Sequence, residues 1–296
     1  MSGMEWCLED EPSQTSPECE SVKTALNLLK NEIPSVKLFS VASKFVNPGE
    51  YLKVEHRVIS RAYFKMLEIL KRYLSPNERV KALFLCEAPG AFQQATADWL
   101  KEKLLDWHAV TLPDSIKWTG DPSKVLFQDV ITQPLPDALQ VNLVTGDGGF
   151  EADPSNQEAE NYTLFEAQML RGFDRLMPEG TLVVKFFDMF EANTQALLIE
   201  MTRRFDKAYI LKPWGSRICN SERYFIGVRK RLIPKPTSVS LARLQQIIVE
   251  FAKVQIEALE YAFKLAKTPG ITEDILRHST RTHLEIGKSF DRIIRK

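Results

Sequence analysis

Residues 81–92 read KALFLCEAPGAF, and this stretch decides the fold class of the chain. An apolar run over 82–86 ends in Glu87-Ala88-Pro89-Gly90, and a helical pattern follows over 91–104. A buried parallel strand passes to a helix through a turn of small residues in this way, and the N–H groups at the helix start can face a ligand. Two interpretations stay open, a cofactor site and an ordinary strand-turn-helix, because the turn lacks the G-x-G-x-x-G pattern of a dinucleotide site.

Strand-like and helical patterns alternate outward from this stretch. Helical patterns cover 157–177 and 194–205, and the further strand-like runs are 107–112, 125–127, 141–146, 181–187, 207–211 and 223–228. This alternation predicts an α/β fold with a doubly wound, Rossmann-like, mainly parallel sheet. The short connection between the last two runs predicts one antiparallel strand.

Composition divides the chain into three parts. Residues 1–19 are acidic and poor in large apolar groups, so we predict a disordered acidic arm. The α/β domain is expected over 20–235, with amphipathic helices over 21–33 and 54–73 before the first strand. Over 236–296 we predict a C-terminal helical hairpin, with helices at 241–266 and 272–294 separated by the breakers Pro269 and Gly270.

Charge and cysteine content limit the function classes. Lys+Arg and Asp+Glu number 39 each, so any RNA binding must rest on a local patch rather than on net charge. No apolar run reaches membrane-span length, and the first residues are acidic where a signal peptide would be basic. The four cysteines have neither metal-site spacing nor a disulfide framework. We therefore expect a soluble intracellular protein with no metal site and no membrane contact.

Charged residues stand at unusual places along the predicted sheet. Lys185 lies inside the most strand-like run, TLVVKFF, and a lysine there is costly unless it is paired, reaches a cavity or lies at a strand end in solvent. Asp129 and Asp147 follow two other strands, where an acid can accept from a ribose hydroxyl or an adenine amine. Asp114 also follows a strand, but we interpret it as a loop residue.

A basic row marks the predicted helix over 54–73. Arg57, Arg61 and Lys65 recur at i, i+4 and i+8, so they would share one helix face. This face is either a solvated surface or a set of cations turned toward a phosphate backbone or a reacting oxygen. Spacing alone favours the solvated surface.

Four motifs together resemble one enzyme family. They are Ser60-Arg61-Ala62-Tyr63-Phe64-Lys65, Thr145-Gly146-Asp147-Gly148-Gly149-Phe150, Val183-Val184-Lys185-Phe186-Phe187, and Lys212-Pro213 through Ser216-Arg217 to Ser221-Glu222-Arg223-Tyr224. In this order, over about 54–230, they resemble the FtsJ-type (RrmJ-like) family of S-adenosylmethionine-dependent ribose 2′-O-methyltransferases. The stretches LCEAPGAF (85–92) and LVTGDG (143–148) are most similar to the mRNA cap branch, notably the cap 2 enzymes.

The resemblance implies a function and a set of site residues. The catalytic tetrad would be Lys65, Asp147, Lys185 and Glu222. The cofactor S-adenosylmethionine would be held by Glu87, Ala88, Pro89, Gly90, Ala91, Phe92, Asp129 and Asp147. RNA, expected to be capped mRNA methylated at a cap-proximal ribose, would contact Arg57, Arg61, Ser216 and Arg217.

Two other function classes and one structural question stay open. The same fold could serve an inactive RNA-binding or scaffolding subunit, while a nicotinamide dehydrogenase is disfavoured by the missing glycine fingerprint. The C-terminal hairpin has no counterpart in the resemblance, so its role is open. For Lys185, desolvation and Lys65 would lower the pKa whereas Asp147 and Glu222 would raise it, which leaves the net direction undecided.

Overall fold

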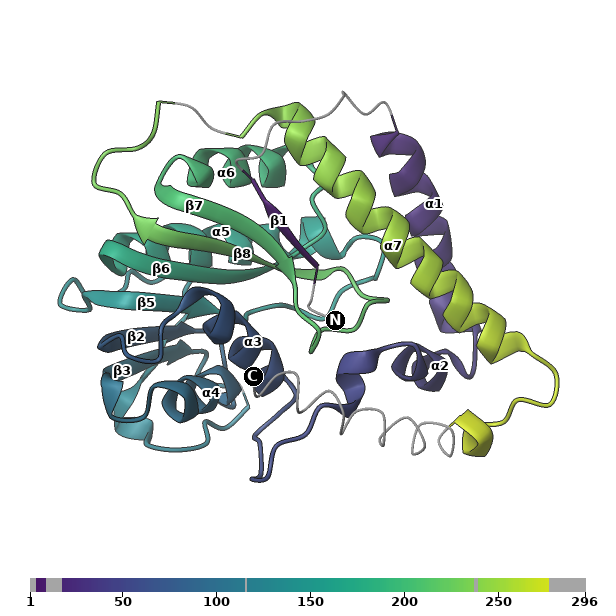
Figure 1. Cartoon of the computed structure of the whole chain (residues 1–296), viewed down its shortest axis with the longest axis horizontal. Helices are drawn as coiled ribbons and strands as arrows, with labels where there is room; N and C mark the ends of the chain where they lie inside the picture. The colour runs from purple at the N-terminus through teal and green to yellow at the C-terminus, as the bar shows by residue number, and fades with distance from the viewer. Residues whose placement is uncertain (1–3, 9–17, 115, 237–238, 277–296) are drawn as a thin grey trace.

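The computed structural model describes residues 4–8, 18–114, 116–236 and 239–276. Within them, an eight-stranded sheet in the order β1-β7-β8-β6-β5-β2-β3-β4 forms the centre of the molecule (Figure 1). The strands are β1 (Met4–Cys7), β2 (Val80–Leu85), β3 (Leu104–Thr111), β4 (Val125–Phe127), β5 (Val141–Gly146), β6 (Leu176–Phe187), β7 (Phe205–Lys212) and β8 (Glu222–Lys230). The doubly wound, mainly parallel sheet expected from the sequence is confirmed.

Two strands run against the rest of the sheet. β4, β3, β2, β5 and β6 pair in parallel, whereas β8 is antiparallel to both of its neighbours, β6 and β7. The connection over 213–221 is too short for a crossover, so β8 returns directly beside β7. This is the predicted antiparallel strand. β1, which pairs antiparallel with β7 at the sheet edge, is a second one that the sequence did not indicate.

The strand order reverses between β2 and β5. From β2 the chain proceeds outward to β3 and β4, and then it returns to the other side of β2 to form β5 and β6. The connections diverge at such a switch point and leave a crevice at the carboxyl ends of the two strands. Glu87 and Ala88 follow β2 here, and Asp147 and Gly148 follow β5.

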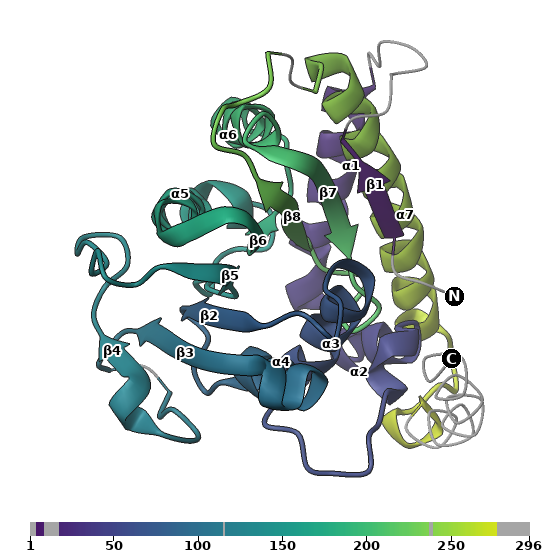
Figure 2. The ribbon, with the colours of Figure 1, turned by 60° about the vertical axis from the view of Figure 1, so that its left-hand side comes forward.

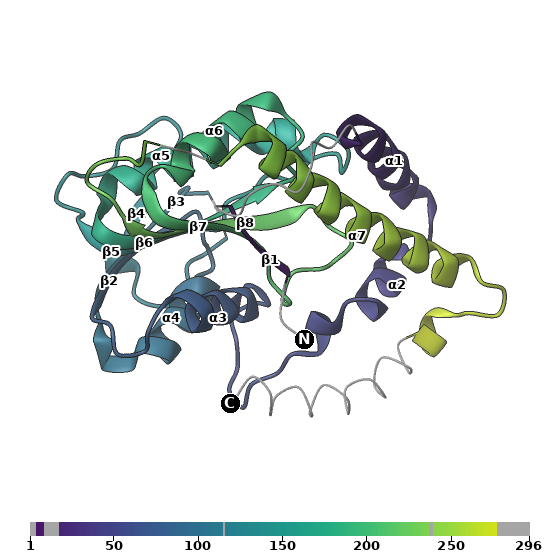
Figure 3. The same ribbon diagram turned by 45° about the horizontal axis from the view of Figure 1, so that its top comes forward.

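Helices cover both faces of the sheet (Figure 3). α3 (Ala62–Tyr73) and α4 (Ala91–Leu100) pack on one face, and α5 (Gln157–Arg175) and α6 (Ala192–Thr202) pack on the other. Along β2 the side chains alternate between the two cores, with Phe84 facing α3 and α4 and Leu85 facing α5. Because both faces are buried, the strand reads as a continuous apolar run. Within the parts of the chain that the structure describes, every helix is too short or too polar to cross a membrane.

Three further helices form an extension beside the sheet (Figure 2). α7 (Leu241–Lys267) lies along α1 (Cys19–Glu32) and contacts α2 (Phe39–Phe45). Leu244, Ile247 and Phe251 of α7 join the core on the α5–α6 face, so α7 is packed into the α/β domain. The first helix of the predicted hairpin is therefore present. The second is helical over 273–276, and its remainder lies outside the described residues.

The acidic arm and the start of the helix over 54–73 are among the sequence-based assignments that differ from the structure. Met4–Cys7, assigned to a disordered arm, form β1, because the open edge of β7 supplies a pairing partner that local composition does not reveal. The helix expected over 54–73 begins only at Ala62. Ahead of it, the Ile59 N–H donates to Gln94 Oε1 (2.8 Å), and the Arg57 carbonyl accepts from Gln94 Nε2 (2.9 Å), so α4 holds this backbone in an irregular path.

Candidate active site

The four tetrad residues converge at the carboxyl edge of the parallel strands. Lys65 Nζ lies 2.7 Å from Glu222 Oε2, and Lys185 Nζ lies 3.3 Å from Asp147 Oδ1. The four side chains are only 9–14% exposed, so both ion pairs are largely shielded from water. The structure thus brings together residues from α3, β6, β8 and the end of β5, as the family resemblance implied; their catalytic roles stay predictions.

The register of β6 and β8 places two of these groups. Lys185 lies opposite Tyr224, and Phe187 lies opposite Glu222. Opposite residues on paired strands point to the same face, so these four side chains share one face of the sheet. The Tyr224 hydroxyl donates to Asp147 Oδ1 (2.7 Å), which fixes the carboxylate that Lys185 also contacts. Sequence reasoning assigned Tyr224 no role.

A close backbone contact joins α3 to the loop before Glu222. A Cβ at Gly215 would lie 2.9 Å from the Lys65 backbone nitrogen, so a side chain at this position would push the loop away from α3. The Trp214 N–H donates to Glu68 Oε2 of α3 at 2.7 Å. The loop that carries Glu222 therefore rests directly on the helix that carries Lys65.

Burial and charge act in opposite directions on the Lys65–Glu222 pair. Burial alone would raise the pKa of Glu222, but Lys65, Lys185 and Lys212 outweigh it and lower the pKa to about 2. Burial alone would lower the pKa of Lys65, but Glu222 and Asp147 outweigh it and raise the pKa. Lys65 is therefore held as a cation at neutral pH and is unsuited to accept a proton.

Lys212, a buried lysine in the fourth motif to which the sequence assigned no role, shapes the same loop. Lys212 Nζ donates to the carbonyls of Asn220 (2.7 Å) and Glu222 (2.8 Å). Burial lowers the pKa of Lys212 well below its usual range. Its position at the end of the apolar run YILK is the same signal that drew attention to Lys185.

A pocket of about 390 Å³ lies at the ends of β2 to β5. Of the predicted cofactor residues, Ala88 and Asp129 line it, together with Gly148 and Gly149 after Asp147. Gly90, Ala91 and Phe92 are buried and do not line it. A Cβ at Gly90, where φ is +105°, would lie 3.0 Å from Trp118, so this glycine serves the turn and its packing rather than a close approach to a ligand.

Glu87 lies buried beneath this pocket. One of its carboxylate oxygens, Oε1, accepts from the Thr145 hydroxyl, while Oε2 is buried and has no hydrogen-bond partner among the described residues. Burial raises the pKa of Glu87 well above its usual range. A buried acceptor without a partner is uncommon in folded proteins, and it fits a site where a ligand supplies the donor.

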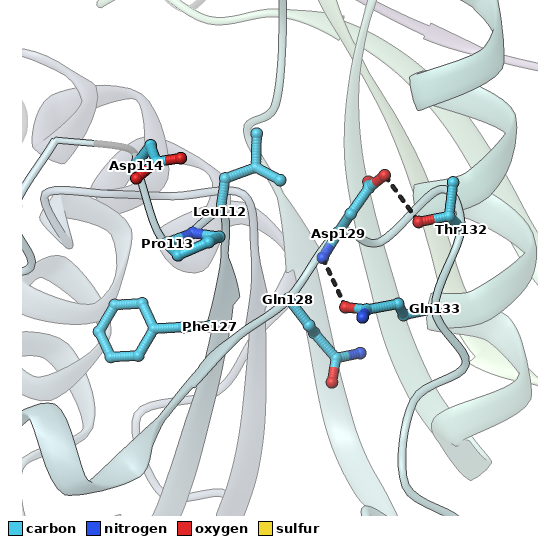
Figure 4. Close-up of a pocket in the computed structure, with 8 residues that line it drawn as sticks. All are labelled: Leu112, Pro113, Asp114, Phe127, Gln128, Asp129, Thr132 and Gln133. Atoms are coloured by element: carbon cyan, nitrogen blue, oxygen red, sulfur yellow. Dashed lines mark hydrogen bonds between the residues drawn. The ribbon is translucent and has the colours of Figure 1, made fainter.

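Asp114 and Asp129 lie at the outer part of this pocket. Both also line a neighbouring pocket of about 400 Å³ (Figure 4). The Asp129 carboxylate accepts from the Ile131 N–H (2.8 Å) and from the Thr132 hydroxyl (2.9 Å), so it already orders its own loop. Asp114 is exposed, and our interpretation of it as a mere loop residue missed its place on the pocket wall.

The predicted RNA residues separate into two groups. Arg61 donates to the carbonyls of Gly49 and Glu50, and Ser216 is buried with its hydroxyl 3.3 Å from Asn220 Oδ1. Both side chains bind loop residues of this chain, and their assignment as RNA contacts stays a prediction. Arg57 is exposed but lies ahead of α3. Arg217 is 46% exposed, and its Nε lies 3.5 Å from Glu50 Oε2.

A third pocket, of about 230 Å³, lies between the helical extension and the loop that precedes Glu222. Lys30 of α1 and Phe39 of α2 line it, as do Arg217 and Ser221, the residue before Glu222. Ala152 and Pro154, in the segment after Asp147, complete the same wall. The pocket combines apolar side chains with the guanidinium of Arg217, whose side chain is 46% exposed.

Curated relatives include RNA-modifying enzymes. A cap-specific mRNA (nucleoside-2′-O-)-methyltransferase 2 from Danio rerio is 26% identical over 277 residues, covering 76% of this chain and 37% of that protein. A cap-specific mRNA (nucleoside-2′-O-)-methyltransferase 1 from Trypanosoma brucei brucei is 32% identical over 177 residues, covering 50% of this chain and 47% of that protein. A probable methyltransferase of African swine fever virus is 28% identical over 254 residues, covering 71% and 60%. The chain spans 37–60% of the length of these three relatives.

A family model extends over most of the sheet and all four tetrad residues. The FtsJ-like methyltransferase model matches residues 58–230, which run from just before α3 to the end of β8. α1, α2 and α7 lie outside the matched segment. The match covers more than half of the chain and agrees with the sheet order and with the convergence of Lys65, Asp147, Lys185 and Glu222. This chain therefore belongs to the FtsJ-like methyltransferase family.

Proposed function

We propose that this chain transfers a methyl group from S-adenosylmethionine to a ribose 2′-hydroxyl of RNA, at a cap-proximal nucleotide of mRNA. The observation that carries the proposal is the convergence of two lysines and two carboxylates as shielded ion pairs beside a pocket at the sheet switch point. Two of the relatives above are named as cap-specific mRNA 2′-O-methyltransferases, which supports capped mRNA as the substrate.

The residues present fit the proposed cofactor. The unpartnered Oε2 of Glu87 could accept from an ammonium group, and the carboxylate of Asp114 could accept from ribose hydroxyls. A Cβ at Gly148 would lie 2.8 Å from both Cys86 Cβ and Gln168 Oε1, so the backbone forms this part of the pocket wall. When bound, the cofactor would supply an electrophilic methyl group.

The tetrad would prepare the ribose hydroxyl for an in-line displacement. Such a reaction requires the attacking oxygen to be held about 3–3.5 Å from the methyl carbon. Lys65 is held as a cation by Glu222, so it can stabilise developing negative charge on the oxygen. We assign activation of the hydroxyl to Lys185, whose partner Asp147 also accepts from Tyr224 and is thereby oriented.

The 230 Å³ pocket is the proposed entry for RNA. It is lined by Ser221, the residue before Glu222, and by Arg217, whose side chain is 46% exposed. Because the net charge of the chain is zero, affinity for RNA would come from such local cations and would fall steeply with salt.

Calorimetric titration of the cofactor, paired with a methyl-transfer assay on RNA, tests the function. Cofactor binding with transfer to RNA supports it, and cofactor binding without transfer would instead identify an inactive RNA-binding subunit.

Asp114→Ala is expected to weaken S-adenosylmethionine binding on the order of 10-fold to 100-fold, because one charge-assisted hydrogen bond is lost. Asp137→Ala is the matched control, since the Asp137 side chain is 98% exposed and lies on neither pocket wall of Asp114. Calorimetry measures both affinities. Equal affinities in the two variants would return Asp114 to its first interpretation as a loop residue.

Arg217→Ala is expected to raise the KM for RNA and to reduce the salt dependence of binding, by a slope of about 0.7 for one lost phosphate contact on a single strand. Arg61→Ala should instead lower the melting temperature, since it removes contacts to the backbone of Gly49 and Glu50. Arg79→Ala, an exposed change at the amino end of β2, is the control. If Arg217→Ala and Arg79→Ala bind RNA alike at every salt concentration, Arg217 is no RNA contact.

A further inference from the structure

A buried ionic network lies directly behind the tetrad. Asp188 follows β6 and is three residues after Lys185. Its Oδ2 lies 2.5 Å from Lys30 Nζ of α1, and its Oδ1 lies 2.6 Å from Arg223 Nη1 of β8. The three side chains are only 3–5% exposed. The network therefore joins Arg223, the residue after Glu222, and Asp188, the residue after β6, to a helix outside the family segment.

Helix α7 contacts the residues at the start of β8 and just before it. Gln255 Oε1 accepts from Arg223 Nη2 (3.3 Å), while Gln255 Nε2 donates to the Cys219 carbonyl (3.2 Å) and the Ser221 hydroxyl (3.4 Å). The Arg223 guanidinium also lies 4.7 Å from the centroid of the Phe251 ring. Ser221 and Arg223 flank Glu222, so both chain neighbours of this carboxylate are anchored to α7.

We propose that α7, with α1, is a positioning element of the active site, which fixes Glu222 against Lys65 through Arg223, Ser221 and Asp188. The proposal rests on the function proposed above, and it gives the C-terminal helix a role that the resemblance left open. Glu222 is tied to Lys65 by a 2.7 Å contact. A displacement of about 1 Å in a catalytic constellation can cost on the order of 100-fold in rate.

A general stabilising role for α7 makes a different prediction. If α7 only buries apolar surface, any core substitution in it should lower the melting temperature without changing turnover in the folded fraction. If α7 positions Glu222, only substitutions that touch Arg223 or the Glu222 loop should lower kcat. The two roles are therefore separated by comparing kcat at saturation between matched core positions.

Phe251→Leu and Phe263→Leu form the matched pair. Both rings belong to α7 and are buried. Phe251 contacts Arg223, whereas Phe263 packs against Phe39, with 5.1 Å between the two ring centroids. Gln255→Leu is the second test, since it removes three hydrogen bonds to the residues at the start of β8 and just before it. For each full-length variant we would measure kcat and KM for RNA and cofactor, melting temperature, and amide hydrogen exchange over 217–222.

We expect Phe251→Leu and Gln255→Leu to lower kcat on the order of 10-fold or more at saturating substrates, with cofactor affinity unchanged. Exchange over 217–222 should accelerate in these two variants and not in Phe263→Leu. Unchanged kcat in both variants, or equal losses in Phe251→Leu and Phe263→Leu, would overturn the positioning role. If the unmodified chain methylates no RNA, the proposed function fails by itself, and the exchange comparison alone decides whether α7 orders the Glu222 loop.

Discussion

Lys185→Ala is expected to abolish measurable methyl transfer, a loss on the order of 10²–10⁴-fold, while cofactor affinity stays nearly unchanged. Lys185 Nζ lies 3.3 Å from Asp147 on the tetrad face of β6, and the side chain is 12% exposed. It does not line the 390 Å³ pocket, whereas Gly149 does, and a Cβ at Gly149 would lie 3.3 Å from Lys185 Cε. The lysine therefore lies behind the pocket wall. Lys185→Ala would remove an interaction with the reacting hydroxyl that acts in the transition state, and the cofactor contacts in the pocket would remain.

The control for this prediction is Lys81→Ala, which removes an exposed lysine from strand β2 of the same sheet. Single-turnover assays with labelled cofactor measure the chemical step, and calorimetry measures cofactor affinity. Lys65→Ala and Glu222→Ala should behave like Lys185→Ala, because each breaks the other ion pair. Transfer by Lys185→Ala within a few-fold of the unmodified chain would show that Lys185 does not activate the hydroxyl.

Asp188→Ala is expected to lower the free energy of unfolding by about 3–5 kcal/mol, because it leaves two buried cations without their shared anion. Lys30 and Arg223 both contact Asp188, and all three side chains are 3–5% exposed. Asp206→Ala is the matched control, since Asp206 also contacts two arginines but is 31% exposed. It should cost less than about 1 kcal/mol. Urea unfolding measures both values.

The effect of Asp188→Ala should depend on pH in a defined direction. Burial alone would raise the pKa of Asp188, but Lys30 and Arg223 outweigh it and lower the pKa to about 2. The same group in an unfolded chain titrates near about 3.9. The stabilisation is therefore complete above pH 4 and is lost as the pH falls toward 2. Two results would contradict the buried network. One is a difference in unfolding free energy between Asp188→Ala and the unmodified chain that stays constant over this pH range. The other is an equal loss of unfolding free energy in Asp188→Ala and Asp206→Ala.

The sheet and the tetrad could be predicted because their signals are local. β4 and β5 have the predicted bounds, since short apolar runs with acids after them are typical of buried parallel strands. Lys185 drew attention because a charge inside an apolar run requires a partner. The resemblance of the four motifs to the FtsJ-type family then implied that Lys65, Asp147 and Glu222 share this site with Lys185.

The parts that were missed depend on partners distant in sequence. Lys30 continues the apolar stripe of Val22 and Leu26, which was a local signal for burial, but its partner Asp188 lies 158 residues away. The loop contacts of Arg61 were missed because spacing cannot reveal that the Gly49 and Glu50 carbonyls accept its hydrogen bonds. β1 was missed for the same reason, since only the folded sheet exposes the edge of β7.

The position of the transferred methyl group tests the central claim most directly. The chain would be incubated with a capped RNA oligonucleotide and S-adenosylmethionine carrying a labelled methyl group, and the digested product would be sequenced by mass spectrometry. A parallel substrate would lack the 2′-hydroxyl at the cap-proximal nucleotides. We predict one labelled methyl group on a cap-proximal ribose, and none on the deoxy substrate. A methyl group on a base, or equal labelling of the deoxy substrate, would contradict ribose 2′-O-methylation by the Lys65–Asp147–Lys185–Glu222 site.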